Sequence, residues 1–326
     1  MRYIGSKAST LSALEELIVS RVSSGDLCDP FGGIGTFGAH FRGLGYRVHT
    51  GDLLQFAHDF QAVRVASAAP PEFGSVAEVT GAAEMAEYLN AVPGRHGWLS
   101  QHFAAERTFL TVENARRADA IHAQILTWDA AGRLTDLERS WLMASLISSV
   151  DRVANTAGTY YACLKRLGRR ALRPFVFRPV TVPDGPLGTA VLADAADLAA
   201  SRTWDVLYLD PPYTARRYGA YYHLPELIAR GAEPRPRGAS GITALPHRPS
   251  PYYTKGSLAA LTSLLERARF ELLVLHYSDT GLMDPVELTA ALARFGSVTT
   301  ALLPAVGYRT TTGSRVVVHR VLLVAP

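Results

Sequence analysis

The chain has 326 residues, of which 48% are hydrophobic and 19% are charged. This composition excludes a largely disordered protein, and the length is sufficient for one large domain or for a core with a sizeable insertion. The formal net charge of +4 is mildly basic, so it permits a nucleic-acid partner without requiring one.

The cysteines and the apolar runs further limit the class of protein to which the sequence can belong. Cys28 and Cys163 are too few for a disulfide framework and lack the spacing of zinc ligands, and no histidine shows metal-ligand spacing, so we expect no bound metal. The N-terminal stretch "MRYIGSKAST" has no apolar signal-peptide region, and the longest apolar runs have only the length of a strand. We therefore expect a soluble, cytoplasmic protein without a membrane segment.

Short apolar runs predict a parallel sheet. They lie at Leu27–Cys28, Tyr46–Thr50, Ala190–Ala193, Val206–Leu209 and Glu271–His276. Helix-like stretches separate several of them, which is typical of parallel strands joined by crossover helices. Near the C-terminus, "SVTTALLP" and "SRVVVHRVLLV" are joined through a Gly/Thr turn and predict an antiparallel hairpin.

Between Asp52 and about Pro186, the short apolar runs that predict strands no longer recur. The stretch "LTDLERSWLMASLISSVDRV" predicts a helix, because Thr135 and Glu138 have the spacing of a capping box and apolar residues recur at helical spacing. A second helix is predicted from about Gln101 to Trp128. We interpret this block as a helical insertion in an α/β core, and we expect the later segment "GAEPRPRGASGITALPHRPSPYYTKG" to be a surface loop. Within the insertion, we expect four aromatic residues to pack in the core: Trp128, Trp141, Tyr160 and Tyr161.

A glycine-rich turn, "LCDPFGGIGTFGAHF", leads from a predicted strand into a helix. Gly33, Gly35 and Gly38 fit the pattern G-x-G-x-x-G, which lets the backbone approach a ligand closely. Asp52 follows at the end of the next strand, where an acid can bind both hydroxyls of a ribose. These residues predict a site for a nucleoside cofactor, but they do not distinguish NAD from S-adenosylmethionine. A turn that serves only tight packing is the alternative.

The stretch "DVLYLDPPYTARRYG" places an acid, two prolines and a tyrosine directly after a strand. One proline would suffice to end the strand, and the acid and the tyrosine would then have no role. The carboxylate of Asp210 and the backbone carbonyl of Pro211, held by the fixed φ of Pro211 and Pro212, can accept the two N–H bonds of a nucleobase amine. Tyr213 offers a flat face for a base that has left its stack.

Here "LDPPY" and "DPFGGIG" resemble motifs of the N6-adenine DNA methyltransferases, in the DNA adenine methylase and restriction-modification methylase families. "RYIGSK", "NTAGTYYACLK" and the continuation of D-P-P-Y through Glu226 are similar to further segments of these enzymes. The resemblance implies an α/β fold with a Rossmann-like S-adenosylmethionine-dependent methyltransferase sheet, a C-terminal antiparallel hairpin and a helical insertion. It implies a catalytic domain of residues 1–60 and 187–326 and a mostly helical target-recognition insertion of residues 61–186. Thr214, where asparagine often follows the tyrosine, and Pro225, which interrupts the next helix, depart from the pattern.

Carried over to this sequence, the resemblance implies direct methyl transfer from S-adenosylmethionine to N6 of a flipped-out adenine in a specific DNA sequence, without a covalent intermediate or a metal. Asp210, Pro211, Pro212 and Tyr213 would hold the target adenine. Lys7 would lie at the methionine end of the cofactor, Asp52 at its ribose and Asp194 near its adenine. The full set of implied cofactor-binding residues is Tyr3, Lys7, Asp29, Phe31, Gly33, Gly35, Asp52 and Asp194.

Basic residues mark the predicted contact with double-stranded DNA. The segment from Tyr161 to Pro183 contains no acid and six basic side chains: Lys165, Arg166, Arg169, Arg170, Arg173 and Arg178. Such a run is often an ordinary solvated face, but its position at the end of the insertion favours phosphate contact. The predicted DNA-binding residues are Lys165, Arg166, Arg169, Arg216 and Arg217. The resemblance is also compatible with a cognate restriction or defence system as partner.

Several alternatives stay open at this point. A methyltransferase acting on cytosine N4 presents a similar chemistry, although such enzymes more often carry serine in place of Asp210, and an RNA adenine methyltransferase would use the same groups. A nicotinamide-dependent oxidoreductase explains the glycines and Asp52 but gives no role to D-P-P-Y or to the basic segment. A catalytically silent DNA-binding module would leave the intact acid and tyrosine unexplained.

Overall fold

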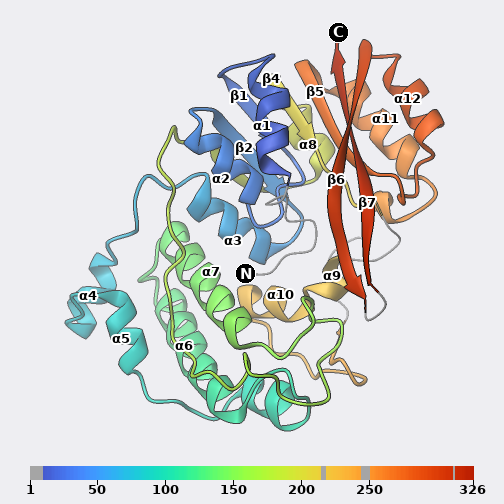
Figure 1. Cartoon of the computed structure of the whole chain (residues 1–326). Coiled ribbons are helices and arrows are strands. Elements are labelled where there is room, and N and C mark those ends of the chain that lie inside the picture. The colour runs from blue at the N-terminus through green and yellow to red at the C-terminus, as the bar shows by residue number, and fades with distance from the viewer. Residues whose placement is uncertain (1–9, 214–217, 244–249, 311–312) are drawn as a thin grey trace.

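A seven-stranded sheet forms the centre of the protein (Figure 1). A computed structural model describes residues 10–213, 218–243, 250–310 and 313–326. The strands follow the order β3-β2-β1-β4-β5-β7-β6. They are β1 (Asp26–Asp29), β2 (Arg47–Asp52), β3 (Thr189–Leu192), β4 (Thr203–Leu209), β5 (Arg269–Ser278), β6 (Ser297–Thr310) and β7 (Gly313–Ala325). The first five are parallel, whereas β7 is antiparallel to both β5 and β6, so the predicted parallel sheet and C-terminal hairpin are confirmed.

Helices cover both faces of this sheet. On one face lie α1 (Leu11–Val19) and α2 (Thr36–Gly43), and on the other lie α8 (Ala195–Ala199), α11 (Ser257–Arg267) and α12 (Pro285–Leu292). The strand β4 is therefore buried on both faces. Val206 and Tyr208 lie in the core under α1 and α2, whereas Leu207 and Leu209 lie in the core on the opposite face. A strand buried on both faces reads as a continuous apolar run, which is why it could be recognised from the sequence.

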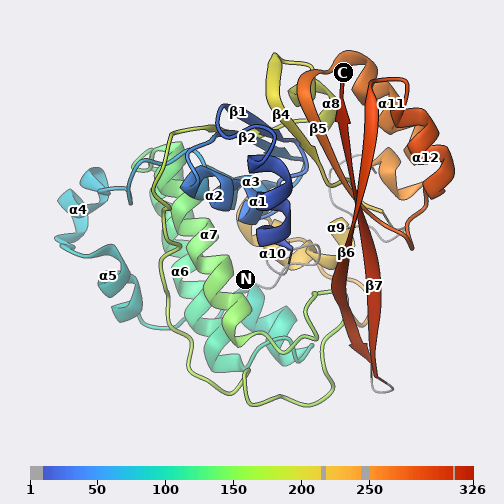
Figure 2. The ribbon, with the colours of Figure 1, turned by 45° about the horizontal axis from the view of Figure 1, so that its top comes forward.

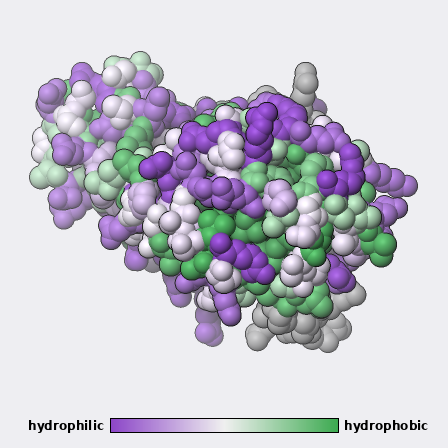
Figure 3. Space-filling model, turned by 90° about the horizontal axis from the view of Figure 1, so that it is seen from above, coloured by the Kyte–Doolittle hydropathy of each residue, from purple (hydrophilic) through white to green (hydrophobic). Residues whose placement is uncertain are grey.

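A block of helices packs at one end of the sheet (Figures 1 and 2). It consists of α3 (Gln55–Arg64), α4 (Gly74–Thr80), α5 (Met85–Ala91), the π-helical turn η1 (Ser100–Ala105), α6 (Val112–Ala130), α7 (Asp136–Val153), α9 (Tyr218–Tyr221) and α10 (His223–Arg230). One hydrophobic core joins Phe60 of α3, Ile121 of α6, Leu146 of α7 and Leu227 of α10. The helices between β2 and β3 therefore pack against the segment that follows D-P-P-Y. Figure 3 shows α4 and α5 standing out at the left edge of the molecule.

The helix α7 begins as the sequence predicts. The Thr135 hydroxyl accepts the backbone N–H of Glu138 at 3.3 Å, and the Glu138 carboxylate accepts that of Thr135 at 2.7 Å, which completes the capping box. The continuous helix predicted from Gln101 to Trp128 is wrong. The π-helical turn ends at Ala105, and α6 starts only after Thr111, whose side chain caps it by accepting the N–H of Asn114.

Three of the four aromatic residues predicted to pack in the core are buried, namely Trp128, Trp141 and Tyr160. The prediction is wrong for Tyr161, whose side chain is 54% exposed. None of the helices in the described part of the chain combines the length and the apolar content of a membrane-spanning segment.

The carboxyl ends of the parallel strands point toward the helical block, and α9 and α10 lie on the side of this block that faces the sheet (Figures 1 and 2). The strand β5 pairs with β7 only over Leu273–Ser278, whereas the β6–β7 pairing continues outward to Thr310 and Gly313. The hairpin therefore extends past the end of β5 and runs beside α9 in both views. In open sheets, ligands bind at the carboxyl ends of the strands, so the site is expected here.

Candidate active site

The glycine loop between β1 and α2 has a backbone that only glycine adopts readily. Gly33 and Gly35 have φ angles of 51° and 70°, in the left-handed region. At Gly32, a Cβ atom would lie 1.9 Å from the Thr50 hydroxyl oxygen, so a side chain is sterically excluded there. Gly38 lies within α2, where a Cβ would come to 3.0 Å from Val65 and 3.3 Å from Val48 of β2, so glycine lets this helix pack closely on the sheet. The glycine pattern did not include Gly32, although the Gly-Gly pair was a visible signal.

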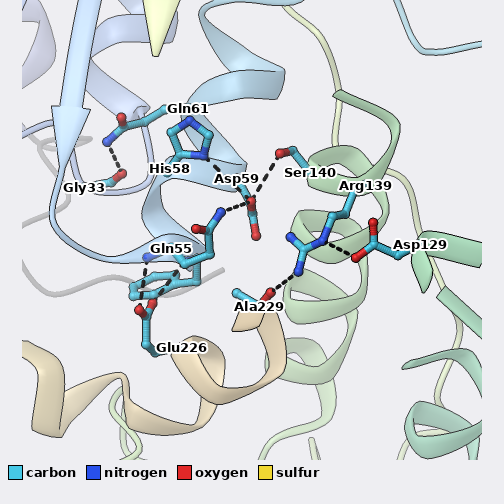
Figure 4. Close-up of polar contacts among 11 residues, drawn as sticks. Gly33, Gln55, His58, Asp59, Gln61, Asp129, Arg139, Ser140, Glu226 and Ala229 are labelled. Carbon is cyan, nitrogen blue, oxygen red and sulfur yellow. Dashed lines mark hydrogen bonds and ion pairs between the residues drawn. The ribbon is translucent and has the colours of Figure 1, made fainter. Parts of the chain in front are cut away.

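Three polar side chains hold this loop in place. The Asp52 carboxylate accepts the Gly33 N–H at 3.1 Å, and the Gln61 side chain donates to the Gly33 carbonyl at 2.8 Å (Figure 4). Arg64 donates to the Ile34 carbonyl at 2.6 Å. Gln61 and Arg64 belong to α3, and sequence reasoning missed both because no local motif indicates that α3 packs behind the loop.

Asp52 lies at the end of β2 and is only partly exposed. One carboxylate oxygen accepts the Gly33 N–H, and the other accepts the Leu54 N–H at 3.0 Å. Burial raises the pKa of Asp52 to about 6, with a further contribution from the negative charge of Glu226, although the backbone N–H bonds oppose this rise. Each carboxylate oxygen can accept more than one hydrogen bond, so this acid can also accept from a ligand's hydroxyl groups.

The acids predicted for the cofactor lie at neighbouring strand ends. Asp29 ends β1 and is 1% exposed, Asp52 ends β2, and the exposed Asp194 follows β3 and caps α8 by accepting the Ala196 N–H at 2.9 Å. The Ala193 N–H donates to the Asp52 carbonyl, which fixes the two segments side by side. The structure thus brings Asp29, Asp52 and Asp194 to one edge of the sheet together with the glycine loop.

An aromatic pair forms part of the same edge. The rings of Phe31 and Tyr252 meet edge to face, with their centroids 5.1 Å apart. Burial raises the pKa of Tyr252, as does the negative charge of Asp194. We expected Tyr252 to lie in a surface loop, and this is wrong, because the 3₁₀ turn Pro251–Tyr253 (η2) buries the ring to 5% exposure. An aromatic residue inside a Pro- and Gly-rich segment was the available signal.

The D-P-P-Y segment begins where β4 ends. Because β4 pairs with β1, Asp210 lies at the sheet edge next to the end of β1. Burial raises the pKa of Tyr208, and the negative charges of both Asp210 and Asp29 add to this rise. The pairing of β1 with β4 places Asp29 and Asp210 at the ends of neighbouring strands, and the negative charges of both act on Tyr208. Pro211 is buried, whereas Asp210, Pro212 and Tyr213 are partly exposed.

Tyr213 is fixed by the segment that follows β5. Its carbonyl accepts the Leu282 N–H at 2.9 Å. Its ring lies 6.1 Å from the Tyr277 ring and 6.0 Å from the His319 ring, at interplanar angles of 80° and 75°. Four predicted site residues, Tyr3, Lys7, Arg216 and Arg217, as well as Thr214, lie outside the described residues.

The predicted DNA-binding residues Lys165, Arg166 and Arg169 are exposed on the loop that follows α7. The Asn155 side chain closes the base of this loop, because it donates to the carbonyls of Thr108 and Leu164 and accepts the N–H of Gly168. In contrast, Arg170 forms an ion pair with Asp151 at 3.1 Å and donates to the Arg152 carbonyl, so it ties the loop to α7.

The same loop is attached to the helices that follow D-P-P-Y. The Tyr160 N–H donates to the Tyr221 carbonyl at 2.8 Å, and the Tyr160 carbonyl accepts from the His223 ring at 2.9 Å. Burial lowers the pKa of His223 to about 4, so the ring is neutral near pH 7 and donates through Nε2. Tyr160, which lies near the basic loop, is thus bonded to α9 and α10.

Glu226 of α10 is completely buried and was not predicted as a site residue. Its two carboxylate oxygens accept the N–H groups of Gln55 and Phe56, each at 3.1 Å (Figure 4). Arg230 forms an ion pair with it. The residue before α3, Leu54, provides no side-chain cap, so Glu226 supplies it from a distant part of the chain. The Leu54 N–H, directly before α3, donates to Asp52 at the end of β2. The cap by Glu226 therefore connects α10, through the start of α3, to the edge of the sheet.

Among the described residues, no three His, Cys, Asp or Glu side chains lie together in a group that could hold a metal ion. The polar groups at the strand ends are instead carboxylates and backbone groups around a glycine loop. This arrangement suits an organic ligand that carries hydroxyl groups.

Comparison with known proteins identifies the relatives of this chain. The family model of the D12 class N6 adenine-specific DNA methyltransferases matches residues 3–288. The chain is 32% identical over 307 residues to the type II methyltransferase M.NlaIII of Neisseria lactamica, covering 91% of this chain and 89% of that protein. It is 30% identical to the type II methyltransferase M.FokI of Planomicrobium okeanokoites and 29% identical to the modification methylase StsI of Streptococcus sanguinis. These matches cover 95% and 90% of this chain but only 49% and 46% of those two proteins.

Proposed function

The chain belongs to the D12 class of N6 adenine-specific DNA methyltransferases, and from this premise we propose that it uses S-adenosylmethionine as methyl donor. The carboxyl ends of β1, β2 and β4 then bind the cofactor and the target base side by side. The observation that carries the proposal is the common edge of the sheet. The glycine loop and Asp52 lie beside the end of β1, and Asp210 follows the adjacent strand β4.

The residues at this edge fit the proposed cofactor. The backbone at Gly33 and Gly35 leaves room for close approach, and Asp52 retains acceptor capacity for the two ribose hydroxyls. The pair of Phe31 and Tyr252, with Asp194 nearby, supplies an apolar wall and an acceptor for the adenine end. When bound, S-adenosylmethionine supplies a methyl group made electrophilic by the positively charged sulfur.

The D-P-P-Y segment prepares the nucleophile. The lone pair of an adenine N6 is delocalised into the ring, so the amine is a poor nucleophile. Asp210 and the Pro211 carbonyl accept its two N–H bonds and draw the nitrogen toward a tetrahedral geometry, while Tyr213 stacks on the base. Positioning and these two acceptors lower the barrier. The N6 proton leaves after transfer, since an ordinary carboxylate is a weak base.

The basic loop and the helical block complete the proposal. Lys165, Arg166 and Arg169 contact DNA phosphates, and residues 61–186 contribute the surface that reads the target sequence. We further infer that the enzyme marks DNA beside a cognate nuclease, because several of its relatives carry the names of type II or modification methylases.

Product analysis tests the proposed function. The purified protein is incubated with labelled S-adenosylmethionine and either duplex DNA or RNA of matching sequence, and the modified nucleosides are then identified. We expect N6-methyladenine in the DNA only, at one short sequence. N4-methylcytosine, methylated RNA or a complete lack of transfer would each overturn the proposal, and a response to NADH in place of S-adenosylmethionine would favour an oxidoreductase.

A further inference from the structure

A chain of hydrogen-bonded side chains crosses three adjacent strands behind D-P-P-Y. The Tyr208 hydroxyl on β4 lies 3.2 Å from Nδ1 of His276 on β5, and Nε2 of His276 lies 2.9 Å from Nδ1 of His319 on β7. His276 is fully buried, and Tyr208 is 1% exposed and stacks on Phe37, with ring centroids 3.7 Å apart. The orientation of the His319 ring is therefore tied to side chains that have little freedom to move.

This row of hydrogen-bonded side chains ends at His319, whose ring contacts the ring of Tyr213. The His319 and Tyr213 rings are nearly perpendicular, and Tyr277 meets Tyr213 in the same manner from β5. The Tyr277 hydroxyl is itself fixed, because it accepts the Met283 N–H at 3.0 Å. At Gly281, a Cβ atom would come within 2.3 Å of the Tyr277 ring, so the loop after β5 can close on that ring only with glycine.

We infer that His319 is a positioning residue for methyl transfer, which holds the Tyr213 ring in the orientation that stacks on the flipped base. The inference rests on the proposed function, since it assigns the target base to Tyr213. Tyr213 lies beyond the end of its strand, where a side chain is held less rigidly than within the sheet. Through His276 and His319, the sheet supplies this rigidity, and a ring oriented before the base arrives avoids an entropic cost during transfer.

The test compares variants on the same strand. His319→Ala removes the ring beside Tyr213, and Val318→Ala is the matched control, because it shortens a neighbouring exposed side chain of β7. We expect His319→Ala to lower the single-turnover rate of methyl transfer about tenfold and to leave the affinity for S-adenosylmethionine unchanged. The control should stay within about twofold of the wild type on both measurements.

A fluorescent base separates positioning from a general loss of structure. With 2-aminopurine at the target position, the signal of His319→Ala in complex with DNA should move from the wild-type value toward that of Tyr213→Ala. His319→Phe keeps a ring at this place but loses the bond to His276, so its signal and rate should fall between those of wild type and His319→Ala. If His319→Ala does not fold, His319→Phe alone tests the inference.

A wild-type rate and a wild-type 2-aminopurine signal in folded His319→Ala, or in His319→Phe alone, would overturn the inference. The proposed function fails separately, namely if the wild-type protein forms no N6-methyladenine in DNA, and the assigned target site fails if Tyr213→Ala and Asp210→Ala still transfer the methyl group normally. Loss of transfer in those two variants beside normal transfer in the His319 variants would reject only the role of His319.

Discussion

At the scale of single residues, Asp52 has the most consequential environment. Its carboxylate holds the glycine loop through the Gly33 N–H, and its pKa is raised to about 6 by burial and by Glu226. In the folded protein, Asp52 is therefore ionised at pH 7.5 and largely protonated at pH 5. The protonated form accepts hydrogen bonds from ribose hydroxyls less well than the carboxylate does.

This pKa predicts how cofactor binding depends on pH. Because only the ionised form of Asp52 is expected to bind the ribose well, the affinity for S-adenosylmethionine should rise with pH through about 6 and level off above 7. The dissociation constant should be about tenfold larger at pH 5 than at pH 7.5, as expected for a group that must lose one proton before binding. Calorimetric titration at a series of pH values measures this. Asp52→Asn should bind weakly at every pH, and a flat profile in the wild-type protein would contradict the role of Asp52.

At the scale of elements, Glu226 joins two helices that are far apart in the sequence. It caps the first turn of α3 from within α10, and its buried charge is balanced by Arg230 and by two backbone N–H groups. Removing one partner of a buried charged network leaves the others unsatisfied, which costs more than the loss of an exposed ion pair.

Glu226→Ala should therefore lower the free energy of unfolding by about 3 kcal/mol. Glu226→Gln retains an acceptor for the N–H groups and should lose less. Denaturant unfolding measures both, with Glu266→Ala as the control, because Glu266 forms an exposed ion pair with Arg294 and should cost less than about 1 kcal/mol. Equal losses in Glu226→Ala and Glu266→Ala would show that the cap contributes little.

The sequence predicted those elements whose signals are local. The strands are apolar runs, the hairpin is two such runs around a turn, and α7 carries its capping box at Thr135 and Glu138. The continuous helix from Gln101 was wrong because its start is stabilised from a distance. Asp119 of α6 accepts the N–H groups of Leu99 and Ser100 and thereby holds a separate turn. The cap at Thr111 was a local signal for the true start of α6.

The residues of the candidate site also differ in whether a local sequence signal indicates them. Glycines with positive φ and acids at strand ends could be found from the sequence, since the pattern of strand, turn and helix determines where they lie. Gln61 and Glu226 could not, because their contacts join segments that only the folded chain brings together. For Tyr252 the signal was an aromatic residue in a Pro- and Gly-rich segment, which does not indicate its contact with Phe31.

At the scale of the whole molecule, the helical block and the methyltransferase sheet are not separate bodies. Gln61 and Arg64 of α3 donate to the glycine loop that follows β1, and α3 shares a hydrophobic core with α6, α7 and α10. The segment that carries the basic loop is bonded to α9 and α10. The basic loop and the two helices α9 and α10 are therefore held together by direct hydrogen bonds.

The basic loop predicts a specific salt dependence. Replacing Lys165, Arg166 and Arg169 together by glutamine should weaken binding to all DNA sequences and reduce the slope of log affinity against log salt by about 2 to 3. The control replaces Arg267, Arg269 and Arg294, which are equally charged and exposed but lie at the end of α11, at the amino end of β5 and just after α12. Binding measured at several salt concentrations decides the matter, and an unchanged slope in the first variant would make its three residues ordinary surface.

The claim on which the mechanism depends is that the Asp210 carboxylate holds the target amine. The most direct measurement combines cofactor affinity with the single-turnover rate of methyl transfer for Asp210→Ala. We expect an unchanged affinity for S-adenosylmethionine and a rate reduced by about a thousandfold or more, because the acceptor acts on the amine during transfer. Methyl transfer at a rate near that of the wild type would contradict it.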